Sequence, residues 1–404
     1  MSTRSVTVEC SRCGASFSAN KVLTVCEKCE GALLFHYDLA RVVEQVSKEI
    51  LRKRDNSFWK FAEVLPLSSP ESIVSLGEAY TPVLRLPRNC GLKSESVYVK
   101  DDGRLPTGTF KARGMAVAVS KLKELGVNRV AIPSAGNAGA ALAAYGARAN
   151  MEVHVFMPKD VPETNLRECV ALGARVYLVD GLIDDAAAIL REFRLKHGWF
   201  EASTNKQPYR FEGYKAMAFE IAEQFNWNLP NNIFFPTGGG EGVIGLWKGF
   251  RELIELNLVE EIPRIIAVQS SGCAPLVEAY ERNEAEVTKK WEKASTIAAG
   301  LRVPMPYASY LILRALKDSR GNAVAVDDSE ILSSMKTLLR GGIYACPEAA
   351  STLAALRKLE DEDAISSEEQ LLLCLTGTAL KHLEMMKLEK DKVSMLNKDT
   401  PILL

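Results

Sequence analysis

The sequence lacks any long apolar run. No stretch approaches the roughly 20 apolar residues that a membrane-spanning helix requires. The opening MSTRSVTVECSRC also lacks the apolar centre of a secretory signal peptide. An excess of one charge is missing as well, because 50 basic and 51 acidic residues nearly cancel and form no long block of one sign. We therefore expect a cytoplasmic protein that acts on a small molecule, with neither a membrane nor a nucleic acid as partner.

Disulfide bonds are not expected either. Of the nine cysteines, four cluster near the N-terminus and five lie far apart, at positions 90, 169, 273, 346 and 374. Single cysteines scattered along a chain without secretory features are typical of reduced residues in a protein core. The clustered four need a separate explanation.

These four are Cys10, Cys13, Cys26 and Cys29, two Cys-x-x-Cys pairs separated by twelve residues. Each pair can bring two thiolates from one tight turn to the same ion, and two pairs complete the closed tetrahedron of a structural zinc site. The segment is too short to fold through apolar burial alone, so bound metal would supply its folding free energy. A pair of redox dithiols and a ribbon that has lost its metal are the alternatives.

Strands and helices alternate along most of the chain, which at 404 residues is long enough for two domains and a small appendage. After a helix expected at 39–53, the pattern predicts strands at 96–102, 129–136, 152–158, 175–181, 232–237 and 264–270, and helices at 112–125, 138–150, 184–197, 211–225 and 243–256. This alternation is typical of an α/β fold with parallel sheets covered by helices. Ligands in such folds bind at the loops that follow the strands.

Two of these loops offer an amine and an anion site. LPTGTFKARG places Lys111 at a helix start, where the helix dipole lowers a lysine pKa and favours a nucleophilic amine. A solvated surface lysine is the alternative. PSAGNAGAAL places Ser134, Gly136 and Asn137 at another helix start, where free N–H groups suit an anion and the asparagine amide can bond an oxygen. An ordinary helix cap is the alternative there.

Two further loops offer a phosphate cradle and a hydroxyl. PTGGGEGVIGLWKGF places Gly238, Gly239, Gly240 and Gly242 between a strand and a helix, where bare backbone N–H groups suit a phosphate. The spacing matches neither a Walker A loop nor the dinucleotide fingerprint, and a plain tight turn is the alternative. Thr376 follows an apolar strand, where its hydroxyl can bond a ring nitrogen or cap a helix.

One ligand, pyridoxal phosphate, accounts for all four loops. The lysine would form its Schiff base, the glycine loop would hold its phosphate, the asparagine would contact its O3′ oxygen and the threonine its pyridine nitrogen. A neutral hydroxyl at that nitrogen, in place of a carboxylate, would make the ring a weaker electron sink.

Ordered motifs extend this interpretation over nearly the whole chain. They are GALLFHYDL, LGEAYTPVLRL, KDDGRLPTGTFKARG, PSAGNAGAALAAYGARA, QPYRFEGYKAMAFEIAEQ, PTGGGEGVIGLWKGF, ACPEAASTLAAL and TGTALKH. With them the chain resembles the fold type II pyridoxal phosphate enzymes, and among these the threonine synthases. The resemblance implies two parallel-rich open sheets flanked by helices, a zinc-ribbon-like segment at 1–36, a large domain at 37–100 and 205–404, an inserted small domain at 101–204, and a homodimer.

The resemblance also implies an activity and its residues. The chain would convert O-phospho-L-homoserine and water into L-threonine and phosphate, with Lys111 as Schiff-base lysine and catalytic base. The cofactor would be bound by Asn137, Thr376 and the loop Gly238–Gly242, Glu241 included. The substrate carboxylate would meet Ser134, Gly136 and Ala138, and its phosphate Ser203, Thr204 and Arg210.

Some features leave room for other readings. Glu241 stands where many relatives carry a small residue, and it brings a carboxylate toward a phosphate unless its side chain turns outward.

The resemblance leaves alternative activities open. Cysteate synthase, which would use phosphoserine and sulfite, and threonine or serine ammonia-lyase share this machinery. A non-catalytic regulatory relative is a further alternative, although the intact Lys111 and Asn137 argue against it. The four histidines fall outside the assigned residues, so no histidine acid–base system is expected.

Overall fold

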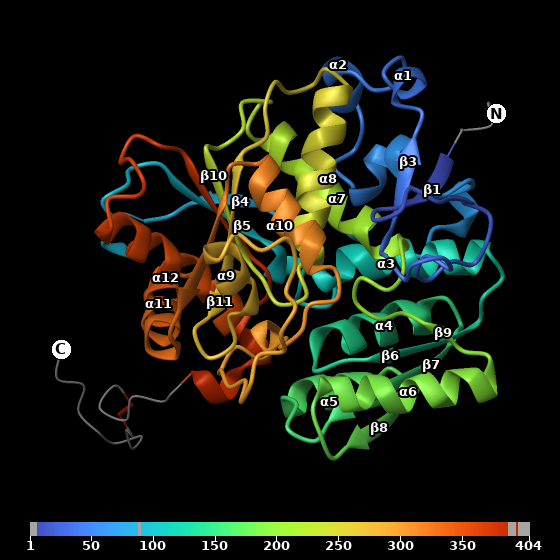
Figure 1. Cartoon of the computed structure of the whole chain (residues 1–404). Coiled ribbons are helices and arrows are strands. Elements are labelled where there is room, and N and C mark those ends of the chain that lie inside the picture. Colours follow the sequence, from blue (N-terminus) through green and yellow to red (C-terminus); the bar gives the residue numbers. More distant parts are fainter. Residues whose placement is uncertain (1–5, 88–89, 387–392, 395–404) are drawn as a thin grey trace, which may run out of the picture.

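The protein is described by a computed structural model, which covers residues 6–87, 90–386 and 393–394 (Figure 1). Its strands form three sheets. The N-terminal sheet is antiparallel with the order β2-β1-β3. Its strands are β1 (Val6–Cys10), β2 (Ser16–Ser18) and β3 (Leu33–Tyr37).

The large sheet has six strands in the order β12-β11-β10-β13-β5-β4, all parallel except β4 at one edge. They are β4 (Val83–Arg85), β5 (Val97–Asp101), β10 (Asn232–Pro236), β11 (Arg264–Ser270), β12 (Asn322–Val326) and β13 (Leu371–Leu375). Every residue of β10 and β13 is buried, as expected for central strands of a parallel sheet covered on both faces.

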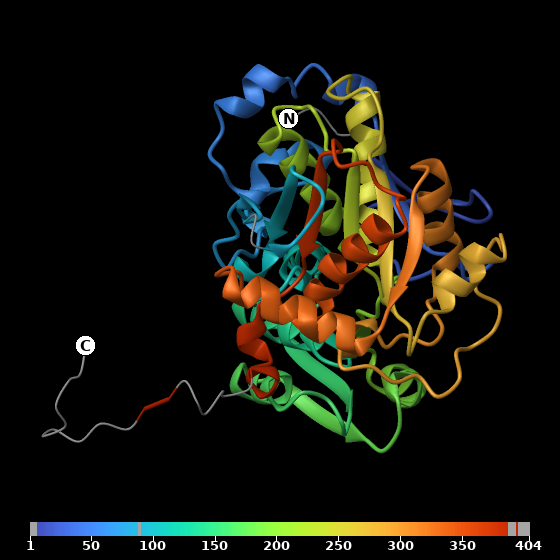
Figure 2. The ribbon, with the colours of Figure 1, turned by 90° about the vertical axis from the view of Figure 1, so that its left-hand side faces the viewer.

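The small sheet has four parallel strands in the order β8-β7-β6-β9. They are β6 (Arg129–Pro133), β7 (Glu152–Pro158), β8 (Arg175–Val179) and β9 (Phe200–Glu201). In the view of Figure 2 this sheet and its helices lie below the large sheet. The two parallel-rich sheets confirm the predicted α/β fold class, whereas the domain boundaries at residues 36, 100 and 204 stay predictions.

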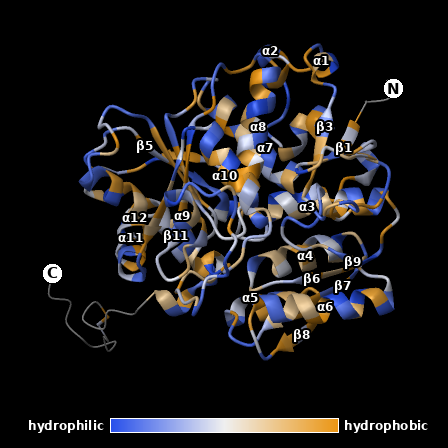
Figure 3. Cartoon of the chain, in the orientation of Figure 1, coloured by the Kyte–Doolittle hydropathy of each residue, from blue (hydrophilic) through white to orange (hydrophobic). Residues whose placement is uncertain are grey.

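Helices cover both faces of each parallel-rich sheet. The longer ones are α3 (Lys111–Glu124), α4 (Asn137–Arg148), α5 (Glu163–Ala171), α6 (Ile183–His197), α7 (Tyr209–Gln224), α8 (Glu241–Glu255), α9 (Pro275–Glu281), α10 (Ser309–Asp318), α11 (Asp328–Arg340) and α12 (Pro347–Asp361). Alternate residues of β10 point to opposite sides: Ile233 and Phe235 join the apolar core under α7, α8 and α10, and Phe234 joins the core under α12. Figure 3, coloured by hydropathy, shows that hydrophobic residues are frequent in the strands.

Glycines let α3, α7 and α8 pack closely. A Cβ atom on Gly213 of α7 would lie 2.0 Å from the carbonyl oxygen of Arg113 on α3, and one on Gly245 of α8 would lie 2.5 Å from the Cβ of Tyr214 on α7. A larger residue would force these helices apart. The packing therefore brings the N-termini of α3 and α8, which carry Lys111 and Glu241, to one place.

The single helix predicted at 39–53 is wrong, whereas the prediction that the five scattered cysteines are core residues is confirmed. Residues 39–53 form two short helices, α1 (Leu39–Val42) and α2 (Lys48–Arg52), because Ser47 is extended and its Oγ accepts the N–H of Ile50 at 3.2 Å, starting a new helix. The five scattered cysteines are free and buried. None of the helices in the described part of the chain has the length and apolar character needed to cross a bilayer.

Candidate active site

A cavity of about 470 Å³ opens where loops from the two parallel-rich sheets meet. Its walls include the loops after β5, β6, β10 and β13, which are the four loops that the sequence singled out. The predicted site residues on its wall are Lys111, Ser134, Gly136, Asn137, Ala138, Ser203, Thr204, Gly238, Gly239, Gly240, Glu241, Gly242 and Thr376. Arg210 is not among the lining residues. The structure thus brings together residues that are up to 265 positions apart in the sequence, from Lys111 to Thr376.

A second concavity, of about 670 Å³, is larger but less suited to chemistry. It includes Asn231 and Arg264, which lie at the amino ends of β10 and β11, and it contains none of the predicted site residues. Ligands of parallel α/β sheets bind at the carboxyl ends of the strands, so the smaller cavity is the candidate active site.

Lys111 is the first residue of α3 and follows β5 through a short 3-10 turn at Asp102–Arg104. Its Nζ donates to Oε2 of Glu241 at 2.8 Å and lies 4.4 Å from the centre of the Phe110 ring. Burial lowers the pKa of Lys111, while Glu241 acts in the opposite direction. An amine with a lowered pKa at the edge of a cavity is suited to nucleophilic attack and to proton transfer.

Backbone hydrogen bonds tie the segment before Lys111 to the loop after β13. The N–H of Phe110 donates to the carbonyl of Thr376 at 2.9 Å, and the N–H of Thr378 donates to the carbonyl of Gly108 at 3.0 Å. Thr376 is 5% exposed and faces the same cavity as Lys111. The two residues are therefore held at one end of the cavity by the backbone.

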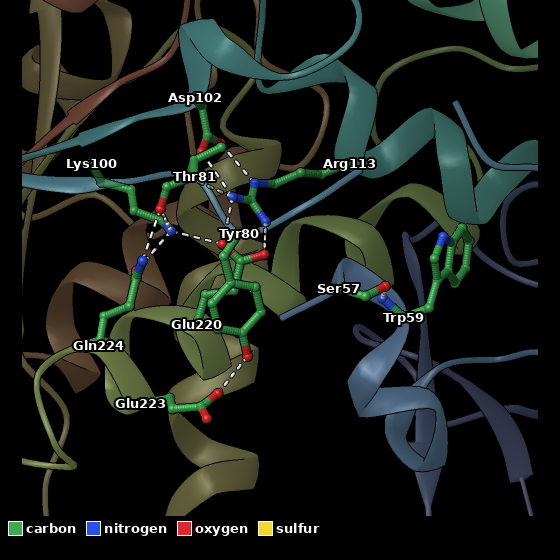
Figure 4. Close-up of polar contacts among 10 residues, drawn as sticks. All are labelled: Ser57, Trp59, Tyr80, Thr81, Lys100, Asp102, Arg113, Glu220, Glu223 and Gln224. Carbon is green, nitrogen blue, oxygen red and sulfur yellow. Dashed lines mark hydrogen bonds and ion pairs between the residues drawn. The ribbon is translucent and has the colours of Figure 1, made fainter. Parts of the chain in front are cut away.

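A buried ion network anchors α3 just beyond Lys111 (Figure 4). Arg113 donates Nε and Nη2 to the carboxylate of Asp102 at 2.7 and 2.8 Å, and Nη1 and Nη2 to the carboxylate of Glu220 at 2.6 and 2.8 Å. Lys100 donates to Glu220 at 2.7 Å from the neighbouring strand β5. Two cations and two carboxylates, all buried, thus join α3, β5 and α7. Because Arg113 is two residues from Lys111, this network fixes the start of α3.

The start of α4 offers an open polar site. Gly136 has φ +151°, and a Cβ atom there would lie 2.7 Å from Nδ2 of Asn165, so a larger residue would be strained and would displace the Asn165 side chain. Oγ of Ser134 accepts the N–H groups of Gly136 and Gly139 at 3.2 and 2.8 Å. Oδ1 of Asn137 is buried and has no hydrogen-bond partner among the described residues. Because buried amides are normally paired, this one is suited to a polar atom of a ligand.

The glycine loop forms a close-fitting cradle. A Cβ atom on Gly238 would lie 2.2 Å from the carbonyl oxygen of Gly300, and one on Gly239 would lie 2.6 Å from Cγ2 of Thr204. Gly240 has φ +80°, a conformation that glycine adopts without strain. The first N–H groups of α8 have no acceptor within the helix, so they are available to an anion. Together with the open amide of Asn137, this cradle fits a phosphorylated aromatic cofactor.

Glu241 lines the cavity and pairs with Arg210 through one of its two carboxylate oxygens. Oε2 of Glu241 accepts from Arg210 at 2.7 Å, from Lys111 at 2.8 Å and from the hydroxyl of Tyr214 at 3.3 Å. Although burial opposes it, the attraction of Arg210 and Lys111 holds the pKa of Glu241 below its ordinary value. Arg210 is 1% exposed and also donates to the carbonyl of Ala202 at 3.1 Å. The sequence did not reveal this ion pair, because its partners come from different helices.

Three of the cavity residues that the sequence analysis did not assign lie on the wall formed by α12 and the loop after β13. They are Cys346, Glu348 and His382, all buried. Oε1 of Glu348 accepts the N–H of Gly300 at 2.7 Å, and its other oxygen lies 3.8 Å from Nε2 of His382. His382 therefore lines the cavity, although the sequence analysis assigned it no role. Its place at the end of the motif TGTALKH was the available signal.

The N-terminal cysteines form a compact cluster. Sγ of Cys10 lies 3.4 Å from that of Cys29, and Sγ of Cys13 lies 3.7 Å from that of Cys26. All four sulfur atoms lie within 4.8 Å of one another, and sulfur atoms around a tetrahedral zinc ion lie about 3.8 Å apart when the Zn–S bonds are about 2.3 Å. Although burial opposes it, N–H groups of Cys13 and Arg12 lower the pKa of Cys10 to about 7. The cluster is compatible with a zinc ribbon.

Comparison with known proteins agrees with this site. Residues 74–377 match the protein family described as "Pyridoxal-phosphate dependent enzyme". Threonine synthase of Methanocaldococcus jannaschii is 36% identical over 92% of this chain and 92% of its own length, and threonine synthase of Methanosarcina acetivorans is 36% identical over 93% and 92%. Among solved structures, maize serine racemase superposes with a TM-score of 0.65 at 22% identity, covering 76% of this chain and 93% of its own. That likeness shows a shared fold.

Proposed function

Because the chain belongs to the pyridoxal-phosphate-dependent enzyme family, and within it to the threonine synthases, we propose that it converts O-phospho-L-homoserine and water into L-threonine and phosphate. The observation that carries the proposal is the meeting of Lys111, Asn137, the glycine loop and Thr376 around one cavity of about 470 Å³. The chain is a pyridoxal-phosphate-dependent lyase. Its cofactor needs an amine, a phosphate site and partners for its ring.

The described residues supply each of these groups. Lys111 would hold the cofactor and, once released, would carry protons at the substrate carbons, a role that its lowered pKa favours. The N–H groups at the start of α8 would bind the cofactor phosphate, Asn137 its O3′ oxygen and Thr376 its ring nitrogen. When bound, the cofactor withdraws electrons from the α-carbon of an amino acid attached to it. The N–H groups at the start of α4, with Ser134, would bind the substrate carboxylate.

Related reactions provide the competing functions. Solved structures that superpose on this chain include an L-serine ammonia-lyase at 20% identity and a threonine deaminase at 20% identity, but at this level the likeness extends to the fold alone. The threonine synthases of Methanocaldococcus jannaschii and Methanosarcina acetivorans are similar along nearly the whole chain. Cysteate synthesis and ammonia release are therefore alternative outcomes of the assay below.

Further features belong to the same proposal. We expect zinc in the four-cysteine cluster, where it would hold the short N-terminal sheet together. The homodimer and the cytoplasmic location that the sequence suggested stay predictions.

A product assay tests the proposed function. Purified protein loaded with pyridoxal phosphate is given phosphohomoserine, phosphoserine with sulfite, or threonine, and phosphate, amino-acid products and ammonia are measured. We expect phosphate and threonine in equal amounts from the first substrate alone. Lys111→Ala should abolish turnover, whereas Lys123→Ala, an exposed lysine of the same helix, should retain it. Cysteate formation, or ammonia from threonine without any threonine synthesis, would replace the proposal with the corresponding alternative.

A further inference from the structure

Three side chains with metal-binding atoms meet on the cavity wall and have no role in the proposed function. They are Cys346, Glu348 and His382, and their sulfur, oxygen and nitrogen atoms all lie within 4.8 Å of one another. Around a tetrahedral zinc ion with ordinary bond lengths, such atoms lie about 3.4–3.6 Å apart. A contraction of about one ångström would therefore bring all three to one ion.

Two neighbouring segments of the backbone bring these residues together. Cys346 is the N-cap of α12 and Glu348 is the second residue of that helix, whereas His382 lies in the loop after β13. The N–H of Cys346 donates to the carbonyl of Gly377 at 2.9 Å, which holds the start of α12 against this loop. The folded backbone thus positions the cluster before any ion binds, as a metal site requires.

Glu348 has one carboxylate oxygen without a partner. Its Oε1 accepts the N–H of Gly300 at 2.7 Å, whereas Oε2 is buried and accepts no hydrogen bond from the described residues. Glu348 is only 7% exposed, and its one ion-pair contact within the described part of the chain is with His382 at 3.8 Å. Because buried charges are normally paired or bound to a metal, this oxygen is suited to a cation.

The ring of His382 is oriented as the ring of a metal ligand would be. Its Nε2 lies 3.8 Å from Oε2 of Glu348, and its Nδ1 lies 3.6 Å from Oε1 of Glu384. Both distances are longer than a hydrogen bond, so neither nitrogen is committed to a carboxylate. Metal-bound histidines commonly direct their second nitrogen toward a carboxylate, which fixes the ring and its tautomer. Glu384 is placed for that supporting role.

Cys346 would supply the sulfur ligand. Burial and the neighbouring Glu348 raise the pKa of its thiol, so the sulfur keeps its proton until a cation displaces that proton to water. The resulting thiolate and the carboxylate would together balance a double positive charge. One sulfur, one nitrogen and one oxygen ligand favour a zinc-like ion over Mg²⁺ or Ca²⁺, which prefer oxygen alone.

We propose that Cys346, Glu348 and His382 form a second metal site, which binds a divalent cation of the zinc class on the wall of the active-site cavity. The site is separate from the four-cysteine cluster and does not depend on the reaction proposed above. Three protein ligands leave the fourth position of the ion to water or to a molecule in the cavity.

Metal stoichiometry tests this site. The full chain, loaded with pyridoxal phosphate, is dialysed against a series of Zn²⁺ concentrations, and bound zinc is measured by mass spectrometry. We expect an equivalent of zinc whose dissociation constant rises at least about tenfold in Cys346→Ser and in His382→Gln, since even loss of a residue that orients a ligand costs about 10- to 100-fold. Glu348→Gln should weaken it similarly while keeping an acceptor for the N–H of Gly300. His197→Gln, which changes an exposed histidine of α6, should bind zinc as the parent protein does.

Cys13→Ser separates this site from the four-cysteine cluster. The variant should lose the zinc of that cluster and keep the zinc that depends on Cys346. If zinc binding is the same in the parent protein and in all three cavity variants, the inference is wrong. Should Cys346→Ser fail to fold, as judged by circular dichroism, His382→Gln and Glu348→Gln decide the question. Zinc binding at the cavity without threonine formation would refute the proposed function alone.

Discussion

Replacing Arg113 by methionine should destabilise the protein strongly. Methionine keeps much of the apolar stem of arginine but removes the cation that joins α3, β5 and α7. Asp102 would then lose both of its bonds to Arg113 and keep the hydroxyl of Thr81 at 2.7 Å. Glu220 would keep Lys100 at 2.7 Å. The variant therefore leaves one buried carboxylate without a cationic partner.

The magnitude follows from this imbalance. Removing one partner of a buried ion pair costs about 3–5 kcal/mol, because the remaining charge is desolvated and uncompensated. A typical domain is stable by only about 5–15 kcal/mol, so the loss is a large share of the total. Since Arg113 is two residues from Lys111, the same change should also loosen the start of α3.

Urea unfolding followed by circular dichroism measures the effect. Arg104→Met is the matched control, because Arg104 is 61% exposed and its pair with Asp101 should contribute less than about 1 kcal/mol. The double variant Asp102→Asn with Arg113→Met should be more stable than Arg113→Met alone, since it removes the unpaired charge. A loss below about 1 kcal/mol for Arg113→Met would refute the reasoning, because desolvation of Asp102 would then be unimportant.

Three further predictions concern the cradle, the cysteines and the buried carboxylate. Gly238→Ala should weaken cofactor binding at least tenfold (about 1.4 kcal/mol), because its Cβ would lie 2.2 Å from a carbonyl oxygen, and a cofactor titration showing unchanged affinity would contradict this. Cys13→Ser should lower the zinc content measured by mass spectrometry, and zinc-free parent protein would refute the metal assignment. Glu241→Gln should cost about 3–5 kcal/mol at neutral pH. Because Arg210 and Lys111 hold the pKa of Glu241 below its ordinary value, the carboxylate stabilises the fold above about pH 4.3 and loses this effect as pH falls through its folded pKa. The difference between parent and variant in urea unfolding should therefore shrink on acidification, and a constant difference would contradict it.

Much of the fold was predictable because its signals are local. The apolar run Glu152–Pro158 forms β7 over the predicted residues, and the alternation of such runs with helical patterns indicated parallel sheets. The single helix expected at 39–53 is wrong, also for a local reason. Ser47, which lies inside the apolar pattern, caps a new helix. Periodicity alone does not distinguish one amphipathic helix from two short ones.

The site was predictable where one loop carries the signal. Lys111, Asn137, the glycine loop and Thr376 each stand at a strand–helix junction with characteristic residues, and the structure places all of them around one cavity. The pairing of Arg210 with Glu241 was not predictable, because it depends on the close approach of α7 and α8. The same holds for the meeting of Glu348 and His382, which come from a helix and a loop more than thirty residues apart.

Covalent trapping of the cofactor tests the central claim most directly. Protein loaded with pyridoxal phosphate is reduced with borohydride, digested and examined by peptide mass spectrometry. We predict that the reduced cofactor is attached to Lys111 alone and that Lys111→Ala yields no labelled peptide. Attachment to another lysine, or no attachment in the parent protein, would contradict the assignment of this cavity as the active site.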